Sequence, residues 1–168
     1  MDVPGFTPDR IIPYKQVGDV TLGLHVFLPS GHQTSDQRPG IVFFFGGGWV
    51  NGSPTQFHPH CHYLASRGMV AMSAEYRIQS KHGTSPRECV QDGKSTLRWI
   101  RAHAAELGLD PGRLAAGGGS AGGHVAAATA TVTGFDEPGE DTATSCRPDA
   151  LCLFNPVFDN SAQGYGFD

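Results

Sequence analysis

The chain has 168 residues, of which 39% are hydrophobic and 17% charged, and a formal net charge of −4 at pH 7. This length fits one domain, residues 1–168, that can bury a sizeable core. The composition excludes a basic surface for nucleic acid or for a membrane, and no apolar run approaches the ~20 residues that span a bilayer.

The first half of the chain is predicted to consist mainly of strands. Apolar residues alternate with other residues along 21–28, which is typical of a strand with one buried face. The uninterrupted apolar run at 41–45 is too short for a helix and predicts a strand buried on both faces. We expect strands at residues 11–17, 21–28, 41–45 and 69–74, and a helix at residues 58–67 that Gly68 ends.

The second half begins with the clearest helix signal in the sequence. Ser85 is a predicted N-cap, Pro86 follows at the first helical position, and Glu88 completes a capping box. Apolar residues at helical spacing extend this helix to Gly108, where a left-handed residue can end it. A turn at residues 110–112, a strand from residue 114, a helix at 124–130, a polar loop at 133–148 and a strand at 150–154 complete the expected elements. Strands that alternate with helices predict an α/β fold with a mostly parallel, doubly wound sheet.

A nucleophile motif lies between the last strand–helix pair. Residues 118–122, Gly-Gly-Ser-Ala-Gly, fit G-x-S-x-G, in which a sharp turn raises a serine hydroxyl above the sheet. Side chains two residues before or after Ser120 would collide with the neighbouring strand or helix. Ser120 would begin a helix, where free amides favour negative charge, and the amide of Ala121 would donate to an oxyanion. In a chain with 23 glycines, this pentapeptide alone can arise by chance.

A second glycine stretch strengthens the interpretation. The buried strand at 41–45 runs directly into Gly46, Gly47, Gly48 and Trp49. Glycines leave backbone amides accessible to a substrate oxygen, and oxyanion donors of this kind follow an earlier strand of the sheet. The alternative, a phosphate or dinucleotide loop, lacks both the G-x-G-x-x-G context and a Walker lysine.

Together these segments resemble the α/β-hydrolase fold, and specifically the esterase and lipase group related to hormone-sensitive lipase and to bacterial acetyl and xylan-type esterases. The matching segments are residues 41–49, 73–77, 85–108, 110–123 and 154–156. The resemblance implies that Ser120 is the nucleophile and that the amides of Gly47, Gly48 and Ala121 form the oxyanion hole. It also implies a small-molecule ester as substrate, with a short acyl group such as acetyl, and no metal or organic cofactor.

The chain departs from this group in two ways. The histidine that usually precedes the three glycines is Phe45 here, which is expected to brace the loop without donating to the oxyanion. The acid and histidine of the catalytic triad follow later strands in this group, beyond Asp168. The resemblance therefore covers a partial domain that lacks the last strands and helices.

None of the histidines present is predicted to be the missing base. His124 lies one helical turn after Ser120 and is expected to point away from the mouth of the site, as a packing or surface residue. Three histidines have metal-like spacing, but a proline lies between them and no companion ligands are found elsewhere, which favours a loop at the start of a helix over a metal site. They are His58, His60 and His62.

The remaining titratable residues give one weak candidate. Asp159 follows the last predicted strand, where some α/β-hydrolases of other families place the triad acid; the alternative is an ordinary loop carboxylate. Glu75 is expected to pair with an arginine, and Asp92 and Glu106 to face solvent. His82 lies in a loop, and no pattern in the sequence marks it as catalytic.

The cysteines and the N-terminus indicate the compartment. Four cysteines without C-x-x-C spacing predict free thiols and neither a disulfide framework nor a zinc site. The first residues lack the regions of a signal peptide, which predicts a cytoplasmic protein. The sequence contains no indication of oligomeric state.

The predicted function is a serine ester hydrolase. The alternatives are a non-catalytic binding or scaffold protein of the same fold, favoured by the missing triad members, and a serine peptidase. Because loss of a triad member leaves only a residual ~10³- to 10⁴-fold acceleration, these 168 residues alone are expected to hydrolyse esters poorly or not at all. An open sheet edge after Phe154 predicts aggregation or dimerisation.

Overall fold

Strands and helices alternate along the chain in the computed structural model, which describes residues 5–165. In chain order the elements are β1 (Arg10–Val17), β2 (Val20–Phe27), β3 (Arg38–Phe44), the 3-10 helix η1 (Pro54–Phe57), α1 (His58–Ser66), β4 (Val70–Ala74), α2 (Gln79–His82), α3 (Pro86–Ala102), β5 (Leu109–Gly119), α4 (Ala121–Thr131) and β6 (Ala150–Phe154). No described helix is long and apolar enough to cross a membrane.

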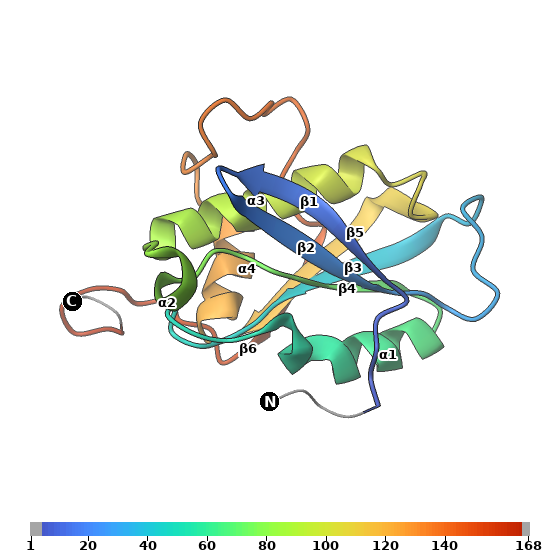
Figure 1. Ribbon diagram of the computed structural model, residues 1–168, viewed down its shortest axis with the longest axis horizontal. Helices are drawn as coiled ribbons and strands as arrows, with labels where there is room; N and C mark the ends of the chain where they lie inside the picture. Colours follow the sequence, from blue (N-terminus) through green and yellow to red (C-terminus); the bar gives the residue numbers. More distant parts are fainter. Residues whose placement is uncertain (1–4, 166–168) are drawn as a thin grey trace.

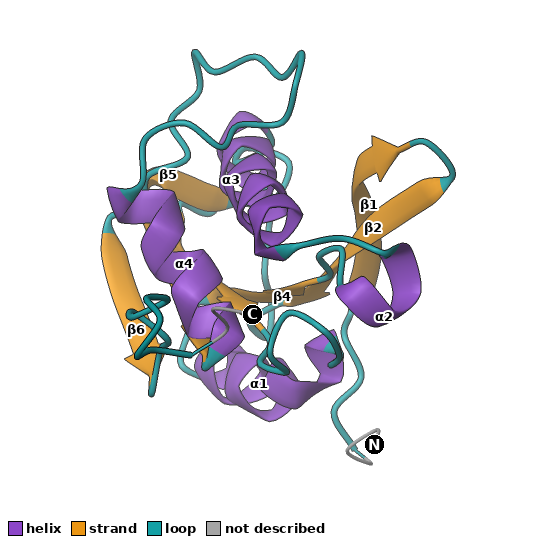
Figure 2. Cartoon of the chain, turned by 90° about the vertical axis from the view of Figure 1, so that its left-hand side faces the viewer, coloured by secondary structure: helices purple, strands orange, loops and turns teal. Residues whose placement is uncertain are grey.

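The strands form one twisted sheet in the order β1-β2-β4-β3-β5-β6 (Figure 1). β1 and β2 form an antiparallel hairpin and β2 is antiparallel to β4, whereas β4, β3, β5 and β6 run parallel. Helices cover both faces, α1 on one and α3 and α4 on the other (Figure 2). This arrangement confirms the predicted α/β fold class.

β3 lies in the middle of the sheet and is buried on both faces, as its apolar run predicts. The Phe43 ring stacks on Phe57 of η1, with ring centroids 4.8 Å apart. On the opposite face, Phe44 lies close to Gly93 of α3, where a Cβ would be 3.8 Å from the Phe44 ring. The strand that leads to the first glycine loop is therefore fixed from both sides.

The predicted capping box of α3 is confirmed, but the helix is shorter than expected. Ser85 accepts a hydrogen bond from Arg87 N, and Glu88 Oε2 accepts one from Ser85 N at 2.8 Å. α3 ends at Ala102, and residues 103–108 form successive turns. Ala104 and Leu107 remain buried in these turns, so the apolar period continues beyond the helical hydrogen bonds.

Three further details differ from the sequence prediction. η1 and α2 are short elements that no periodicity announced. Residues 110–112, expected as a turn, lie within β5, because Leu109 already pairs with Arg38 of β3. β6 pairs with residues 115–119 of β5, forms an edge of the sheet and exposes 40% of Leu151 and 43% of Phe154. The association that this edge predicts stays a prediction.

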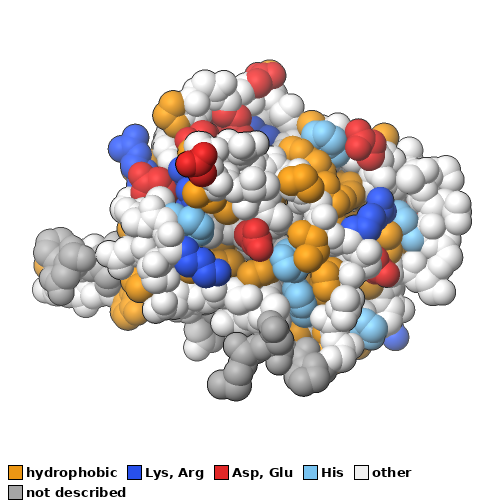
Figure 3. Space-filling view, in the orientation of Figure 1, with side chains coloured by type: hydrophobic (Ala, Val, Ile, Leu, Met, Phe, Trp, Pro, Cys, Tyr) orange, Lys and Arg blue, Asp and Glu red, His pale blue; other side chains and the backbone are white. Residues whose placement is uncertain are grey.

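The polar loop predicted at 133–148 is confirmed as an excursion, and basic side chains of α3 hold it in place. Arg98 pairs with Asp136 at 2.5 Å and with Glu140 at 2.8 Å, and Lys94 donates to the Gly134 carbonyl. Figure 3 shows acidic side chains gathered over this excursion.

All four cysteines are free thiols, as predicted. Cys61 on α1 and Cys89 on α3 are buried on opposite faces of the sheet. Burial raises the pKa of the Cys61 thiol, and it raises that of Cys89 to about 12.

Candidate active site

Ser120 occupies a strained turn between β5 and α4. Its backbone lies at φ 52° and ψ −119°, a conformation that non-glycine residues rarely adopt, and the residue is exposed. A Cβ on Gly118 would lie 2.5 Å from the Gly122 carbonyl oxygen, and one on Gly122 would collide with the carbonyl oxygens of Phe44 and Phe45. The two glycines therefore allow β3, β5 and α4 to meet directly beneath the serine.

The glycine loop after β3, residues 46–52, lies against this turn. A Cβ on Gly46 would lie 2.9 Å from the Gly119 carbonyl oxygen and 3.4 Å from Ser120 Cβ. Gly47 lies at φ +140°, and a Cβ there would collide with the Asn51 carbonyl. The structure thus brings the two glycine-rich segments predicted from the sequence into contact.

Three backbone amides near Ser120 have no acceptor in the part of the chain that the structure describes. Gly46 N donates to Gln56 Oε1 at 2.7 Å, but the amides of Gly47, Gly48 and Ala121 donate to no acceptor among residues 5–165. Free amides beside a serine at a helix N-terminus are the groups that can stabilise a developing oxyanion.

Phe45 is a brace of the loop, as expected from its position. Its ring stacks on Tyr76 with centroids 4.2 Å apart, and Tyr76 Oη donates to the Phe45 carbonyl at 2.6 Å. Further along the loop, Gln79 N at the start of α2 donates to the Trp49 carbonyl at 3.0 Å. The loop is therefore held from three sides by groups outside it.

A buried ion network lies behind this brace, and it corrects the prediction for Asp92. The Asp92 side chain is fully buried and accepts hydrogen bonds from Arg77 N and Arg77 Nη2, both at 2.8 Å. Lys15 of β1 lies 2.7 Å from the same carboxylate, and Glu137 bridges both cations. Asp92 was expected to face solvent, but α3 turns this side toward the segment that carries Tyr76.

Glu75 is a second correction, because it does not pair with an arginine. It directly follows β4, which is paired with β2, so its carboxylate accepts a hydrogen bond from Gly23 N at 2.8 Å and lies 3.5 Å from His25 Nε2. The hydrogen bond with His25 lowers the pKa of Glu75, against partial burial that opposes this shift. Glu106 is exposed, as predicted.

The histidine run lies on α1, not in a loop before it. His58 is buried and its Nε2 lies 3.1 Å from His25 Nδ1, whereas His60 and His62 are exposed. In the part of the chain that the structure describes, no group of three His, Cys, Asp or Glu residues is arranged to hold a metal ion. His82 Nδ1 accepts a hydrogen bond from Ile78 N at 3.0 Å and thereby closes α2.

His124 is a packing residue, one of its two predicted roles, and it packs against the glycine loop. Its ring is partly buried and turns toward the glycine loop, where Trp49 Nε1 donates to Nδ1 at 3.3 Å. Burial lowers the pKa of His124. Its contact with Ser120 is the helical backbone bond alone, and among the described residues no histidine hydrogen bonds to Ser120 Oγ.

Asp159 lies in the exposed segment after β6. Its carboxylate accepts a hydrogen bond from Ser161 N at 2.9 Å, and bonds from Ser161 lower its pKa. The same segment returns to the glycine loop, where the Tyr165 ring lies 5.9 Å from that of Trp49. Asp159 has no histidine partner within residues 5–165.

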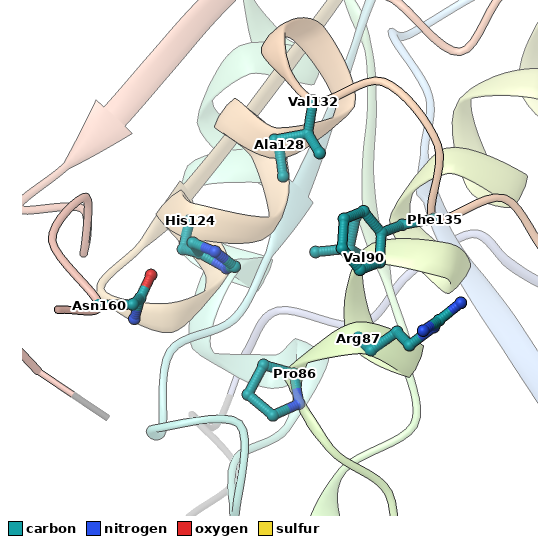
Figure 4. A pocket seen from close by; sticks show the side chains of 8 residues that line it. All are labelled: Pro86, Arg87, Val90, His124, Ala128, Val132, Phe135 and Asn160. Atoms are coloured by element: carbon teal, nitrogen blue, oxygen red, sulfur yellow. The ribbon is translucent and has the colours of Figure 1, made fainter. Parts of the chain in front are cut away.

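Two cavities flank the site. One, of about 490 Å³, runs along Gly48, Trp49 and Tyr165 and is the nearer to the free amides. The other, of about 320 Å³, lies between α3 and α4 and is lined mainly by apolar side chains, with His124 and Asn160 at one end (Figure 4). Both volumes are in the range of small-molecule sites.

Several groups that shape the site could not be recognised in the sequence. Gln56 and Tyr76 hold the loop through single hydrogen bonds to backbone atoms, and nothing in their neighbours announces this. The Trp49–His124 contact joins residues 75 positions apart. The only available signal was the position of Trp49 directly after the glycines.

Comparison with known proteins gives a consistent result. The BD-FAE family model matches residues 24–160. The chain is 31% identical over 136 residues to carboxylesterase NlhH of Mycobacterium tuberculosis, which covers 75% of this chain and 41% of that protein. It is 36% identical over 157 residues to the probable carboxylic ester hydrolase LipM of the same organism, and this alignment covers 87% of this chain and 36% of that protein.

Solved structures of Thermogutta terrifontis esterase 2 are also similar. The apo form gives a TM-score of 0.91 at 49% identity and covers 96% of this chain and 60% of that one. Others of the same esterase, with propionate bound, with butyrate bound or phosphorylated by paraoxon, give TM-scores of 0.90, 0.90 and 0.89. The chain spans about two-fifths of the length of the curated relatives and about three-fifths of the solved esterase.

Proposed function

Since the chain belongs to the BD-FAE family and has the α/β-hydrolase fold, we propose that it carries the nucleophile and oxyanion hole of a serine carboxylic ester hydrolase. The observation that carries this proposal is the exposed Ser120 at φ 52°, beside three amides that have no acceptor among the described residues. The relatives named as carboxylesterases support the same reaction class.

The chemistry follows from the position of these groups. Ser120 Oγ forms a bond to the ester carbonyl carbon while its proton passes to a histidine base, which no residue described here supplies. The carbonyl oxygen gains the negative charge and accepts hydrogen bonds from the amides of Gly47, Gly48 and Ala121. The histidine returns the proton to the departing oxygen, which leaves as the alcohol, and water then attacks the acyl carbon so that the acid is released and the Ser120 hydroxyl is restored. Each oxyanion donor of this kind contributes about 10²- to 10³-fold to such reactions.

The proposed substrate is a small-molecule ester with a short acyl group. The structures of the Thermogutta esterase with propionate and with butyrate support this class, because those are short acids and the protein is similar along almost all of this chain. The cavity of about 490 Å³ beside Gly48 offers space for such a group. No step requires a metal or an organic cofactor.

Covalent labelling tests the proposal without requiring turnover. Paraoxon in excess at alkaline pH, where hydroxide takes the serine proton, should add one diethylphosphoryl group to Ser120 and release p-nitrophenolate, because attack at phosphorus also develops an oxyanion. Intact-mass spectrometry and peptide mapping should show the adduct on Ser120, and none in Ser120→Ala. Ser161→Ala, which removes another exposed serine, should label as the wild type does. An adduct elsewhere, or none after prolonged exposure of the folded chain, would contradict the assignment.

A further inference from the structure

A side-chain contact ties the oxyanion loop to the helix that begins at the nucleophile. Trp49 directly follows the three glycines, lies at φ 62° and is 4% exposed. Its indole Nε1–H donates to His124 Nδ1 at 3.3 Å, with the rings nearly perpendicular at 87° and their centroids 5.2 Å apart. His124 lies on α4, one turn beyond Ser120, so this bond spans the two halves of the site.

This contact restricts the protonation of His124. Indole can only donate, so Nδ1 must carry a lone pair and the proton of the neutral ring must be on Nε2. An imidazolium ring would present an N–H at Nδ1 and would therefore oppose the indole N–H. The bond exists only for the neutral ring with its proton on Nε2.

The surroundings of His124 favour that neutral form. Arg87 of α3 lines the same cavity, and Asn160 lines it from the segment after β6 (Figure 4). Tyr165 contacts the other partner, Trp49. No carboxylate among the described residues lines this cavity to stabilise an imidazolium ion, and burial lowers the pKa of His124. The ring is therefore neutral near pH 7.

We propose that His124 is a positioning residue that holds Trp49, and through it the amides of Gly47 and Gly48, against Ser120 only while its Nδ1 is unprotonated. Its effect on ester chemistry rests on the proposed function above, whereas the contact itself does not. Acidification breaks the bond, releases the glycine loop and lowers the reactivity of Ser120 independently of any catalytic base.

Indole fluorescence tests the contact directly. The chain has two tryptophans, so Trp99→Phe leaves Trp49 as the sole emitter. In this background, Trp49 emission should titrate with a midpoint below the ordinary histidine value of ~6.5, because imidazolium quenches indole. The titration should vanish in His124→Asn. His103→Asn, which removes a histidine stacked on Trp99 at 4.0 Å, is the matched control and should leave it unchanged. A titration that persists in His124→Asn, or none in the parent, overturns the proposal.

The labelling rate of Ser120 tests the consequence. In His124→Asn the new side-chain amide oxygen can accept from Trp49 Nε1 near the position of Nδ1, so this variant should label at the parent rate at pH 8. At acidic pH it should show only the decline that follows hydroxide concentration, whereas the parent should decline more steeply. His124→Leu should label about two- to tenfold more slowly at every pH, the range expected for loss of one hydrogen bond. Equal rates for His124→Leu and the parent, with both variants folded by circular dichroism, would overturn the positioning role. If Ser120 labels in none of the proteins, the proposed function fails, while the fluorescence titration still decides the contact.

Discussion

The two glycine-rich segments of the site are fixed in different ways. The turn at 118–122 is held by exclusion, because its glycines let backbone atoms of β3, β5 and α4 touch with no space for a methyl group. The loop at 46–52 also has glycines without space for a methyl group, Gly47 and Gly52, but in addition it depends on hydrogen bonds to groups outside it. Gln56 and His124 accept hydrogen bonds from the loop, and Gln79 N of α2 donates to it. An atom added at the turn would therefore disturb three elements at once, whereas losing one of the loop's hydrogen bonds leaves the others in place.

The largest effect is expected at the turn at 118–122, which carries Ser120. Gly122→Ala places a methyl group on the carbonyl oxygens of Phe44 and Phe45, which belong to the central strand and its end and cannot move apart. We expect destabilisation above about 4 kcal/mol, at the exceptional end for single substitutions, or no folded protein. Urea unfolding followed by circular dichroism measures it. Gly112→Ala, at an exposed glycine with space for a methyl group, is the control. A folded Gly122→Ala variant of near parental stability would show that the turn at 118–122 does not depend on close backbone contacts.

A smaller but still large effect is expected from the ion network behind the loop. Asp92→Asn keeps the shape of the side chain but leaves Arg77 and Lys15 without their buried partner, at a cost of about 3 kcal/mol. Chemical denaturation measures the change. Asp110→Asn, which breaks the exposed pair with Arg113, should leave the unfolding midpoint unchanged. Equal midpoints for the two variants would mean that the network does not support the loop.

The smallest effect is expected from a single brace. Tyr76→Phe removes the hydroxyl that donates to the Phe45 carbonyl and keeps the stacked ring, so stability should fall by about 1 kcal/mol. Tyr63→Phe, at a tyrosine that is 61% exposed, is the matched control. Thermal or urea unfolding of both variants gives the difference. A Tyr76→Phe loss as large as that of Gly122→Ala would remove the distinction between the two segments.

The same distinction explains what could be predicted from the sequence. Close backbone packing at the turn can be recognised in the sequence. Glycines at fixed offsets from a serine, placed between an apolar strand and a helix of small residues, are typical of few other structures. The capping box of α3 and the apolar run of β3 are local in the same sense. The fold class and the pairing of the two glycine segments could therefore be predicted.

Hydrogen bonds and ion pairs between residues distant in the sequence leave no such local pattern. Asp92 has the spacing of an exposed helical residue and is buried only because α3 packs beside the segment after β4. Glu75 lies close to His25 because β2 and β4 are neighbours in the sheet. The order of the strands in a sheet is not contained in local sequence patterns. The end of α3 was missed because burial continued after the helix stopped. These misses all concern tertiary contacts, which pattern alone does not contain.

The accessibility of the buried thiols on the two faces of the sheet reports local opening of the structure. The thiolate is the reactive form of cysteine, and burial disfavours it at Cys61 and Cys89. A reagent in solution therefore modifies Cys61 only when α1 lifts from its face, and Cys89 only when α3 lifts from the other. The order in which the two sulfurs become accessible distinguishes loosening beneath the histidine-bearing helix from loosening of the helix that secures the ion network.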